Sequence, residues 1–137
     1  MRSATYDHFG KPTEVLSLGD RPIPEPKANE VRVKTILASI HNHDLLTIRG
    51  QYGFKPDMPA IGGSEAVGII DAVGSEVTDL KVGQRVAAAS VQATWAEYFV
   101  AAADMVFPIP DSLEDEMAAQ LIAMPLSALM LLEFLEV

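Results

Sequence analysis

Polar side chains and glycines gather in one stretch of the chain, residues 41–68, between two β-rich segments. The stretch begins with His-Asn-His-Asp at residues 41–44, passes through Tyr52 with glycines nearby on both sides, and reaches a Gly-Gly-Ser-Glu turn at residues 62–65. Loops between apolar strands are where small β-domains place their sites. Two imidazoles and two carboxylates in this stretch are possible ligands of a divalent metal ion: those of His41, His43, Asp44 and Glu65.

Apolar patterns on both sides of this stretch predict the elements that position it. Residues 66–73 are apolar on both faces, which is typical of a buried central strand. Residues 43–49 predict two helical turns with Asn42 as the N-cap. Residues 30–39 alternate as a half-buried strand does, with one face formed by Val31, Val33, Thr35 and Leu37.

Short strands with frequent turn signals continue through most of the chain. This pattern favours a barrel or a sandwich over a parallel sheet. The further strands are expected at residues 2–9 and 14–18, which flank a turn, and at residues 84–89 and 94–100.

The C-terminal part of the chain predicts two helices instead of strands. Ser112 and the acidic residues after it are typical of a helix start. Pro125 suits the first position of a second helix, which runs from Leu126 to about Glu136. That helix is apolar nearly all round and nothing remains in the chain to cover it. We therefore expect a homodimer or other self-association through residues 125–137.

Composition and charge narrow the class of protein. The 137 residues are 49% hydrophobic and 21% charged, which is ordinary for one globular domain. The absence of cysteine excludes disulfides, thiolate zinc sites and thiol catalysis. The net charge is −9, and no lysine or arginine follows Arg85, so nucleic acid is not an expected partner. With no signal-peptide pattern and no membrane span, a cytoplasmic protein is expected.

One run carries a family resemblance: Gly-Gln-Tyr-Gly-Phe at residues 50–54, followed by Met-Pro-Ala-Ile-Gly-Gly-Ser-Glu at residues 58–65. It resembles the medium-chain dehydrogenase/reductase superfamily, specifically its zinc-independent mitochondrial-type enoyl thioester reductases, and the quinone oxidoreductases share a looser version. The resemblance implies a mainly β fold with short helices. Residues 1–124 would form a GroES-like, partly open β-barrel, and residues 125–137 would begin the helix that bridges to a Rossmann cofactor domain.

The same resemblance bears on metal and cofactor. In zinc-dependent members the catalytic ion is held by two cysteines and a histidine, and those positions look like His41, Ser64 and Ala123 here. Two of the three lack a group suited to zinc, so the resemblance implies no metal. The chain contains no Gly-x-Gly-x-x-Gly turn. The cofactor, NADPH, would therefore be bound mainly by the absent domain.

Three residues receive roles from the resemblance. The catalytic tyrosine of the enoyl reductases corresponds to Tyr52, whose phenol would bond the substrate carbonyl oxygen or supply a proton; the alternative is a loop anchor. His43 stands where alcohol dehydrogenases carry a proton-relay Ser or Thr, and it would relay a proton or bond the nicotinamide ribose, or else be a satisfied buried histidine. Ser127 stands where relatives place a Thr against the nicotinamide, or is a back-bonded helical serine. Asp44 and Glu65 are expected to be structural.

Residues and resemblance together predict the substrate-side domain of an NADPH-dependent, zinc-independent oxidoreductase. Its small-molecule substrates would be enoyl thioesters, quinones or related activated double bonds. Residues 41–44 depart from the Asn-Pro-Ser-Asp of the enoyl reductases, which leaves quinones open. One rival is a non-enzymatic fragment that acts as a folding or interaction module. The other is a zinc-type, alcohol dehydrogenase-like enzyme.

Overall fold

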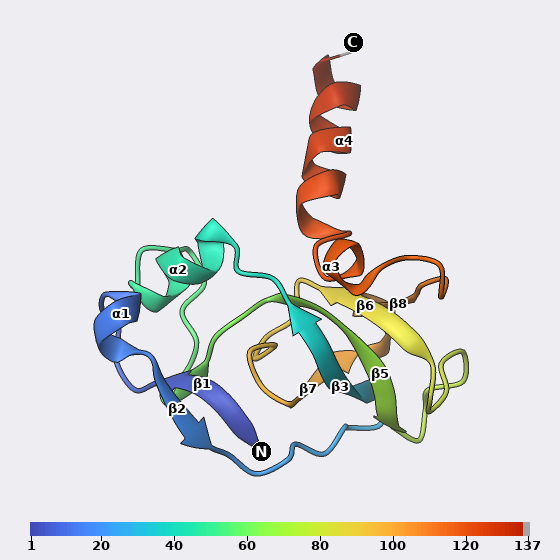
Figure 1. Ribbon diagram of the computed structural model, residues 1–137, viewed down its shortest axis with the longest axis horizontal. Helices are drawn as coiled ribbons and strands as arrows, with labels where there is room; N and C mark the ends of the chain where they lie inside the picture. The colour runs from blue at the N-terminus through green and yellow to red at the C-terminus, as the bar shows by residue number, and fades with distance from the viewer. Residues whose placement is uncertain (136–137) are drawn as a thin grey trace.

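The computed structural model describes residues 1–135, whose strands form two antiparallel sheets (Figure 1). The smaller sheet has the order β2-β1-β4, with β1 (Arg2–Tyr6), β2 (Ser17–Asp20) and β4 (Ala60–Ile61). The larger has the order β7-β3-β5-β6-β8 and comprises β3 (Glu30–Ala38), β5 (Glu65–Val73), β6 (Arg85–Ala89), β7 (Tyr98–Ala102) and β8 (Val106–Pro108). This mainly β fold with short helices confirms the predicted barrel class.

The five-stranded sheet curls around the main hydrophobic core. β5 lies at its centre and pairs with β3 on one side and β6 on the other. Ala66, Val67 and Ile70 of β5 are almost fully buried, which confirms the predicted central strand. Ala66 and Ile70 belong to a core with Val31, Val33, Val86, Phe99 and Val106, and Val67 packs in a separate cluster with Ala118 and Ala119.

β3 follows the predicted alternation only along its first half. Val31 and Val33 are fully buried, as expected. A register shift against β5 lies between Thr35 and Leu37, and Leu37 is 40% exposed. Because an extra residue in a strand re-aims the side chains beyond it, the predicted apolar face does not extend to Leu37.

The second core lies between the smaller sheet and two short helices, α1 (Pro12–Val15) and α2 (Asn42–Ile48). The prediction of a strand at residues 14–18 is wrong in its first half, because Pro12 begins a helical turn that buries Val15. The N-cap of α2 is His41 and not the predicted Asn42. His41 holds that position because its N–H donates to the Asp44 carboxylate at 2.9 Å.

The predicted strand at residues 94–100 is shifted toward the C-terminus, to β7. Trp95 is the cause, since its indole N–H donates to the Ser39 carbonyl at 2.9 Å and its backbone N–H bonds the Gly62 carbonyl. The Trp95 carbonyl also accepts the backbone N–H of Ala4, so this segment lies beside β1 of the smaller sheet. After β7 a single 3₁₀ turn, η1 (Ala103–Met105), leads into β8.

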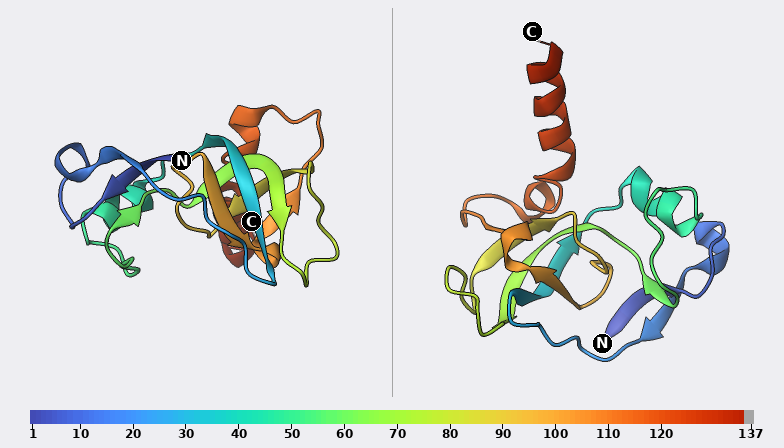
Figure 2. Two further views of the ribbon diagram at one scale, coloured as in Figure 1. Left: turned by 90° about the horizontal axis from the view of Figure 1, so that it is seen from below. Right: turned by 180° about the vertical axis from the view of Figure 1, so that it is seen from behind.

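The C-terminal helices are α3 (Asp115–Ala118) and α4 (Ala123–Leu135). α3 begins within the predicted start at residues 112–115, with Glu114 as its N-cap. The guanidinium of Arg85 bonds the Leu113 carbonyl and the Asp115 carboxylate there. α4 begins at Ala123, before the predicted Leu126. It projects away from the rest of the domain (Figures 1 and 2). None of its described residues is buried. The predicted end near Glu136 lies outside the described residues.

No helix within residues 1–135 is both long enough and apolar enough to cross a membrane.

Candidate active site

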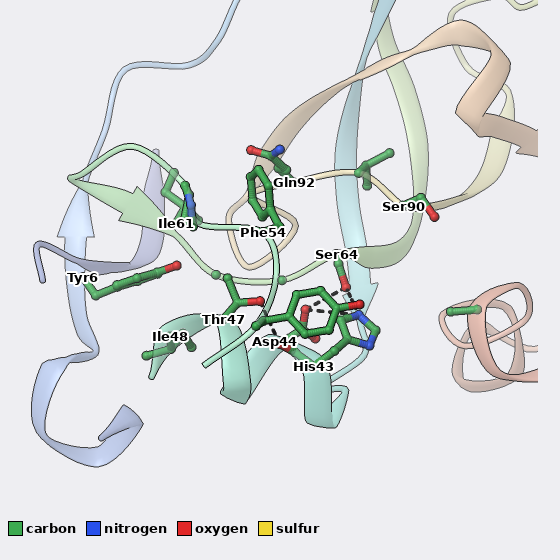
Figure 3. Close-up of a pocket in the computed structure, with 16 residues that line it drawn as sticks. Tyr6, His43, Asp44, Thr47, Ile48, Phe54, Ile61, Ser64, Ser90 and Gln92 are labelled. Carbon is green, nitrogen blue, oxygen red and sulfur yellow. Dashed lines mark hydrogen bonds and ion pairs between the residues drawn. The ribbon is translucent and has the colours of Figure 1, made fainter. Parts of the chain in front are cut away.

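A cavity of about 400 Å³ opens between α2, the loop that follows α2, and the glycine turn at residues 62–64 (Figure 3). Its wall contains both Tyr52 and His43, so the structure brings these two predicted site residues together. Ser127 is not in the wall. The volume is within the range of small-molecule sites. The wall also contains Tyr6, Asp44, Ile48, Ile61 and Ser64.

The Asp44 carboxylate organises the polar end of the cavity. Asp44 is 4% exposed, and each of its oxygens accepts one hydrogen bond. Oδ2 accepts the backbone N–H of His41 at 2.9 Å, and Oδ1 accepts the hydroxyl of Ser64 at 2.7 Å. The carboxylate therefore ties the start of α2 to the glycine turn. This agrees with the structural role expected for Asp44.

The bond to Asp44 fixes the proton on His43. Because the Ser64 hydroxyl donates to the carboxylate, its oxygen is left to accept, and His43 Nε2 lies 2.8 Å away. His43 thus donates through Nε2–H, and its Nδ1 carries the lone pair when the ring is neutral. The ring is half-buried, with 31% of its side-chain surface exposed. The arrangement is a short chain of donors that runs from His43 through Ser64 to Asp44.

Three aromatic rings are stacked in a row, and two of them, those of His43 and Tyr52, line the cavity. His43 lies between His41, at a centroid distance of 5.0 Å and an interplanar angle of 20°, and Tyr52, at 5.7 Å and 29°. Tyr52 is 44% exposed and lines the cavity. Stacking restricts the orientation of the Tyr52 ring on an otherwise glycine-rich loop. The structure therefore presents a positioned phenol beside an imidazole of defined tautomer.

The glycines of the turn make room for Trp95. A Cβ at Gly62 would stand 2.3 Å from Trp95 Cε3, and a Cβ at Gly63 would stand 2.3 Å from Trp95 Cδ1. Gly63 also has a φ of +93°, a conformation that disfavours other residues. The tight turn places Ser64 directly against Asp44 and His43. The double glycine is thus explained by packing and backbone conformation.

Glu65 is fully buried behind the cavity and fastens α4. One carboxylate oxygen lies 2.5 Å from His41 Nε2, and the other accepts the backbone N–H groups of Ile122 and Ala123 at 2.8 and 3.1 Å. Free N–H groups at a helix start favour a negative charge. Glu65 therefore acts as the anchor of α4, in agreement with the structural role expected from the sequence.

Ser127 lies away from the cavity, exposed on α4. Its hydroxyl donates to the carbonyl of Ala123 at 2.7 Å, which is the back-bonded alternative from the sequence. Ala123, at the start of the same helix, does reach the cavity wall. The part of α4 that contacts the site is thus its first residue, and Ser127 stands one turn further out.

The donors present do not suit a catalytic zinc ion. The three positions implied by the zinc enzymes hold an imidazole already paired with Glu65, the hydroxyl of Ser64 and the methyl group of Ala123. Within residues 1–135 no three His, Asp or Glu side chains are grouped closely enough to share a metal ion.

Sequence reasoning missed Tyr6, which the structure places in the cavity wall. Tyr6 is 3% exposed, and burial, followed by the nearby negative charge of Asp44, raises the pKa of its phenol above the ordinary value. Its position depends on the pairing of β1 with β4, where Tyr6 stands opposite Ala60. No local pattern marks Tyr6 as inward-facing, since Ser3, Thr5 and Tyr6 of the same strand are all buried.

Residues 27–111 match the family of alcohol dehydrogenase GroES-like domains. The chain belongs to this family, which confirms the predicted place in the medium-chain dehydrogenase/reductase superfamily. It is 36% identical to the human mitochondrial enoyl-[acyl-carrier-protein] reductase over 136 residues, which are 98% of this chain and 36% of that protein. It is 35% identical to mouse quinone oxidoreductase over 88% of this chain and 37% of that protein.

Solved structures agree with these relatives. The quinone oxidoreductase from Coxiella burnetii superposes with a TM-score of 0.92 at 31% identity, over 100% of this chain and 45% of that one. The Escherichia coli quinone oxidoreductase, solved as a complex with NADPH, gives a TM-score of 0.90 at 28% identity over 96% and 40%. The chain therefore has the fold of the GroES-like domain. It spans just over a third of the length of the curated relatives it matches.

Proposed function

We propose that this chain forms the substrate-side domain of an NADPH-dependent oxidoreductase that reduces quinones, enoyl thioesters or related activated double bonds without zinc. The observation that carries the proposal is the pairing of Tyr52 with His43 in one cavity. The stacked rings hold the phenol, and the chain through Ser64 to Asp44 fixes the imidazole proton. Enoyl reductases and quinone oxidoreductases among the relatives support the reaction class.

The cavity has the chemistry to receive the nicotinamide end of NADPH but not its phosphates. His43 and Ser64 supply polar atoms there, and no lysine or arginine lines the wall. When bound, NADPH supplies a hydride to the substrate and leaves as NADP⁺. One proton must also be delivered so that the double bond or quinone is fully reduced.

Tyr52 is the residue we assign to the charge that develops on the substrate. Hydride addition at the β-carbon of a conjugated carbonyl places negative charge on the carbonyl oxygen. The Tyr52 hydroxyl would donate a hydrogen bond to that oxygen or give up its proton, and a positioned donor acts without reorganising first. His43 would hold the Tyr52 ring and contact the nicotinamide ribose. The contact of Ser127 with the nicotinamide stays a prediction.

A second candidate function rests on α4. Its apolar side chains are uncovered, which favours an interaction module that pairs with another copy of the chain or with a cofactor domain. Within the reductase proposal, the same helix would lead to that cofactor domain. We also keep a cytoplasmic location and the absence of a nucleic-acid partner as proposals, the latter supported by the net charge of −9.

The test is the oxidation of NADPH by the protein that the complete gene encodes, with a crotonyl thioester and with a quinone in parallel. Tyr52→Phe should lower turnover by roughly 10²- to 10³-fold, the usual loss for one oxyanion donor, with little change in cofactor affinity. Turnover within about threefold of wild type on both substrates would show that Tyr52 only anchors its loop. Failure of the unaltered protein to oxidise NADPH with either substrate would refute the proposed function itself.

A further inference from the structure

Tyr6 is a buried residue of the cavity wall whose hydroxyl has no hydrogen-bond partner within residues 1–135. Tyr6 is 3% exposed, and no hydrogen bond within residues 1–135 contributes to the shift of its pKa. The sealed, unpaired side-chain oxygens of the described chain are those of Thr35 and Thr94, and the Tyr6 oxygen is not among them. The hydroxyl can therefore be reached from the cavity. Figure 3 shows the ring extending from β1 toward α2, with the oxygen at its inner end.

The position of Tyr6 gives the cavity two polar ends. Tyr6 and His43 lie on opposite sides in Figure 3, with Ile48 and Ile61 near the Tyr6 side. Because the Tyr6 hydroxyl has no protein partner, only water or a ligand in the cavity can accept its hydrogen bond. A molecule that fills this cavity would therefore gain from a hydrogen-bond acceptor at each end and an apolar body between them.

We infer that Tyr6 Oη donates a hydrogen bond to the second carbonyl oxygen of a para-quinone whose first carbonyl lies at the Tyr52 end. This inference rests on the proposed function, because it names the substrate class of the same site. A para-quinone has two acceptors on opposite sides of a flat apolar ring. An enoyl thioester has one carbonyl and an alkyl tail, and a tail placed against Tyr6 leaves the hydroxyl unpaired. Tyr6 is thus a specificity-determining residue.

The ionisation of Tyr6 agrees with a donor role. Burial and the charge of Asp44 both raise the pKa of the phenol above its ordinary value of about 10. The hydroxyl therefore keeps its proton throughout the neutral and mildly alkaline range, and it can donate to a carbonyl oxygen at any working pH.

Two ligands of similar shape separate this role from simple packing. Calorimetric titration of the 137-residue chain with 1,4-naphthoquinone is compared with 1-tetralone, which retains one carbonyl. Tyr6→Phe should weaken naphthoquinone binding by about 3- to 10-fold, the usual effect of one neutral hydrogen bond, and should leave tetralone within about twofold. Tyr98→Phe, outside this cavity, is the matched control and should change neither affinity.

A second measurement uses the unaltered chain, so its result does not depend on whether the Tyr6→Phe variant folds. With ¹³C at the ζ carbon of tyrosine, naphthoquinone should shift the Tyr6 signal, and tetralone should not. Equal weakening of both ligands, no weakening of either, or no binding of naphthoquinone at millimolar concentration would overturn the inference. Failure of the proposed function is separate, since it is read from NADPH oxidation by the complete gene product.

Discussion

Replacement of Glu65 by leucine tests whether the back of the site holds α4 in place. The Glu65 carboxylate is 0% exposed and accepts from His41 Nε2 and from the backbone N–H groups of Ile122 and Ala123. Leucine is similar in size but offers no acceptor. The substitution would leave the His41 imidazole buried opposite an apolar side chain and two N–H groups of the helix start without their anion.

The expected cost is large because the pair is buried. A buried donor left without an acceptor costs about 1–3 kcal/mol, and three donors lose theirs here, so we expect a loss of about 3–5 kcal/mol out of a total of about 5–15 kcal/mol for an ordinary domain. For a chain of this size that loss lowers Tm by roughly 10–20 °C. Glu65→Gln keeps a carbonyl oxygen for α4 and an amide that can donate to a neutral His41. We expect that variant to lose only about 1–2 kcal/mol.

The assay combines urea unfolding with hydrogen exchange of the α4 amides. Glu65→Leu should raise the hydrogen-exchange rates of the amides in the first turn of α4 far more than those of the amides in β5. Glu76→Leu, at an exposed carboxylate, is the control and should stay within about 0.5 kcal/mol of wild type. A Glu65→Leu protein within 1 kcal/mol of wild type, or with unchanged α4 exchange, would refute the view of Glu65 as the helix anchor.

Three further predictions concern the glycine turn, the uncovered face of α4 and the hydroxyl of Ser127. Gly63→Ala should cost about 2–4 kcal/mol in urea unfolding, from positive φ and the contact with Trp95, whereas Gly53→Ala, with nothing within 4 Å, should be neutral. The chain should self-associate at ~100 µM in equilibrium ultracentrifugation through α4, and Leu131→Glu or Phe134→Glu should restore the monomer; a wild-type monomer would contradict this. Ser127→Ala should raise KM for NADPH a few-fold in the complete gene product, and unchanged KM would remove Ser127 from the cofactor site.

Elements whose pattern comes from their own side chains could be predicted from the sequence. The apolar run of β5 needs no knowledge of its neighbours, and the glycine turn at residues 62–65 carries its own signal. The all-round apolar composition of α4 likewise predicted a helix that its own domain does not cover. Errors appeared where a distant contact decides the local structure. The strand predicted at residues 94–100 is shifted to β7, because Trp95 bonds the carbonyls of Ser39 and Gly62 from elsewhere in the chain.

The candidate site was predictable only in part, because contacts between distant parts of the chain bring some of its residues together. Resemblance to a family placed Tyr52 and His43 in one site, and the structure brings both to one cavity. Tyr6 carries no local signal, because its inward direction depends on the pairing of β1 with β4. The role of Glu65 in holding α4 likewise requires Ala123 to approach from far along the chain.

The two buried carboxylates of the site, those of Asp44 and Glu65, are both occupied by structural hydrogen bonds. Asp44 is occupied by the His41 N–H and the Ser64 hydroxyl, and Glu65 by the His41 imidazole and the start of α4. Neither has an oxygen left without a hydrogen bond, so neither is a ready base for a substrate. The side-chain donors of the cavity wall that have no protein partner within residues 1–135 include the hydroxyls of Tyr6 and Tyr52, whereas the Ser64 hydroxyl and His43 Nε2 already donate. Reduction of a carbonyl-conjugated bond needs donors for developing negative charge, not acceptors, and this is the kind of group that the carboxylates leave free.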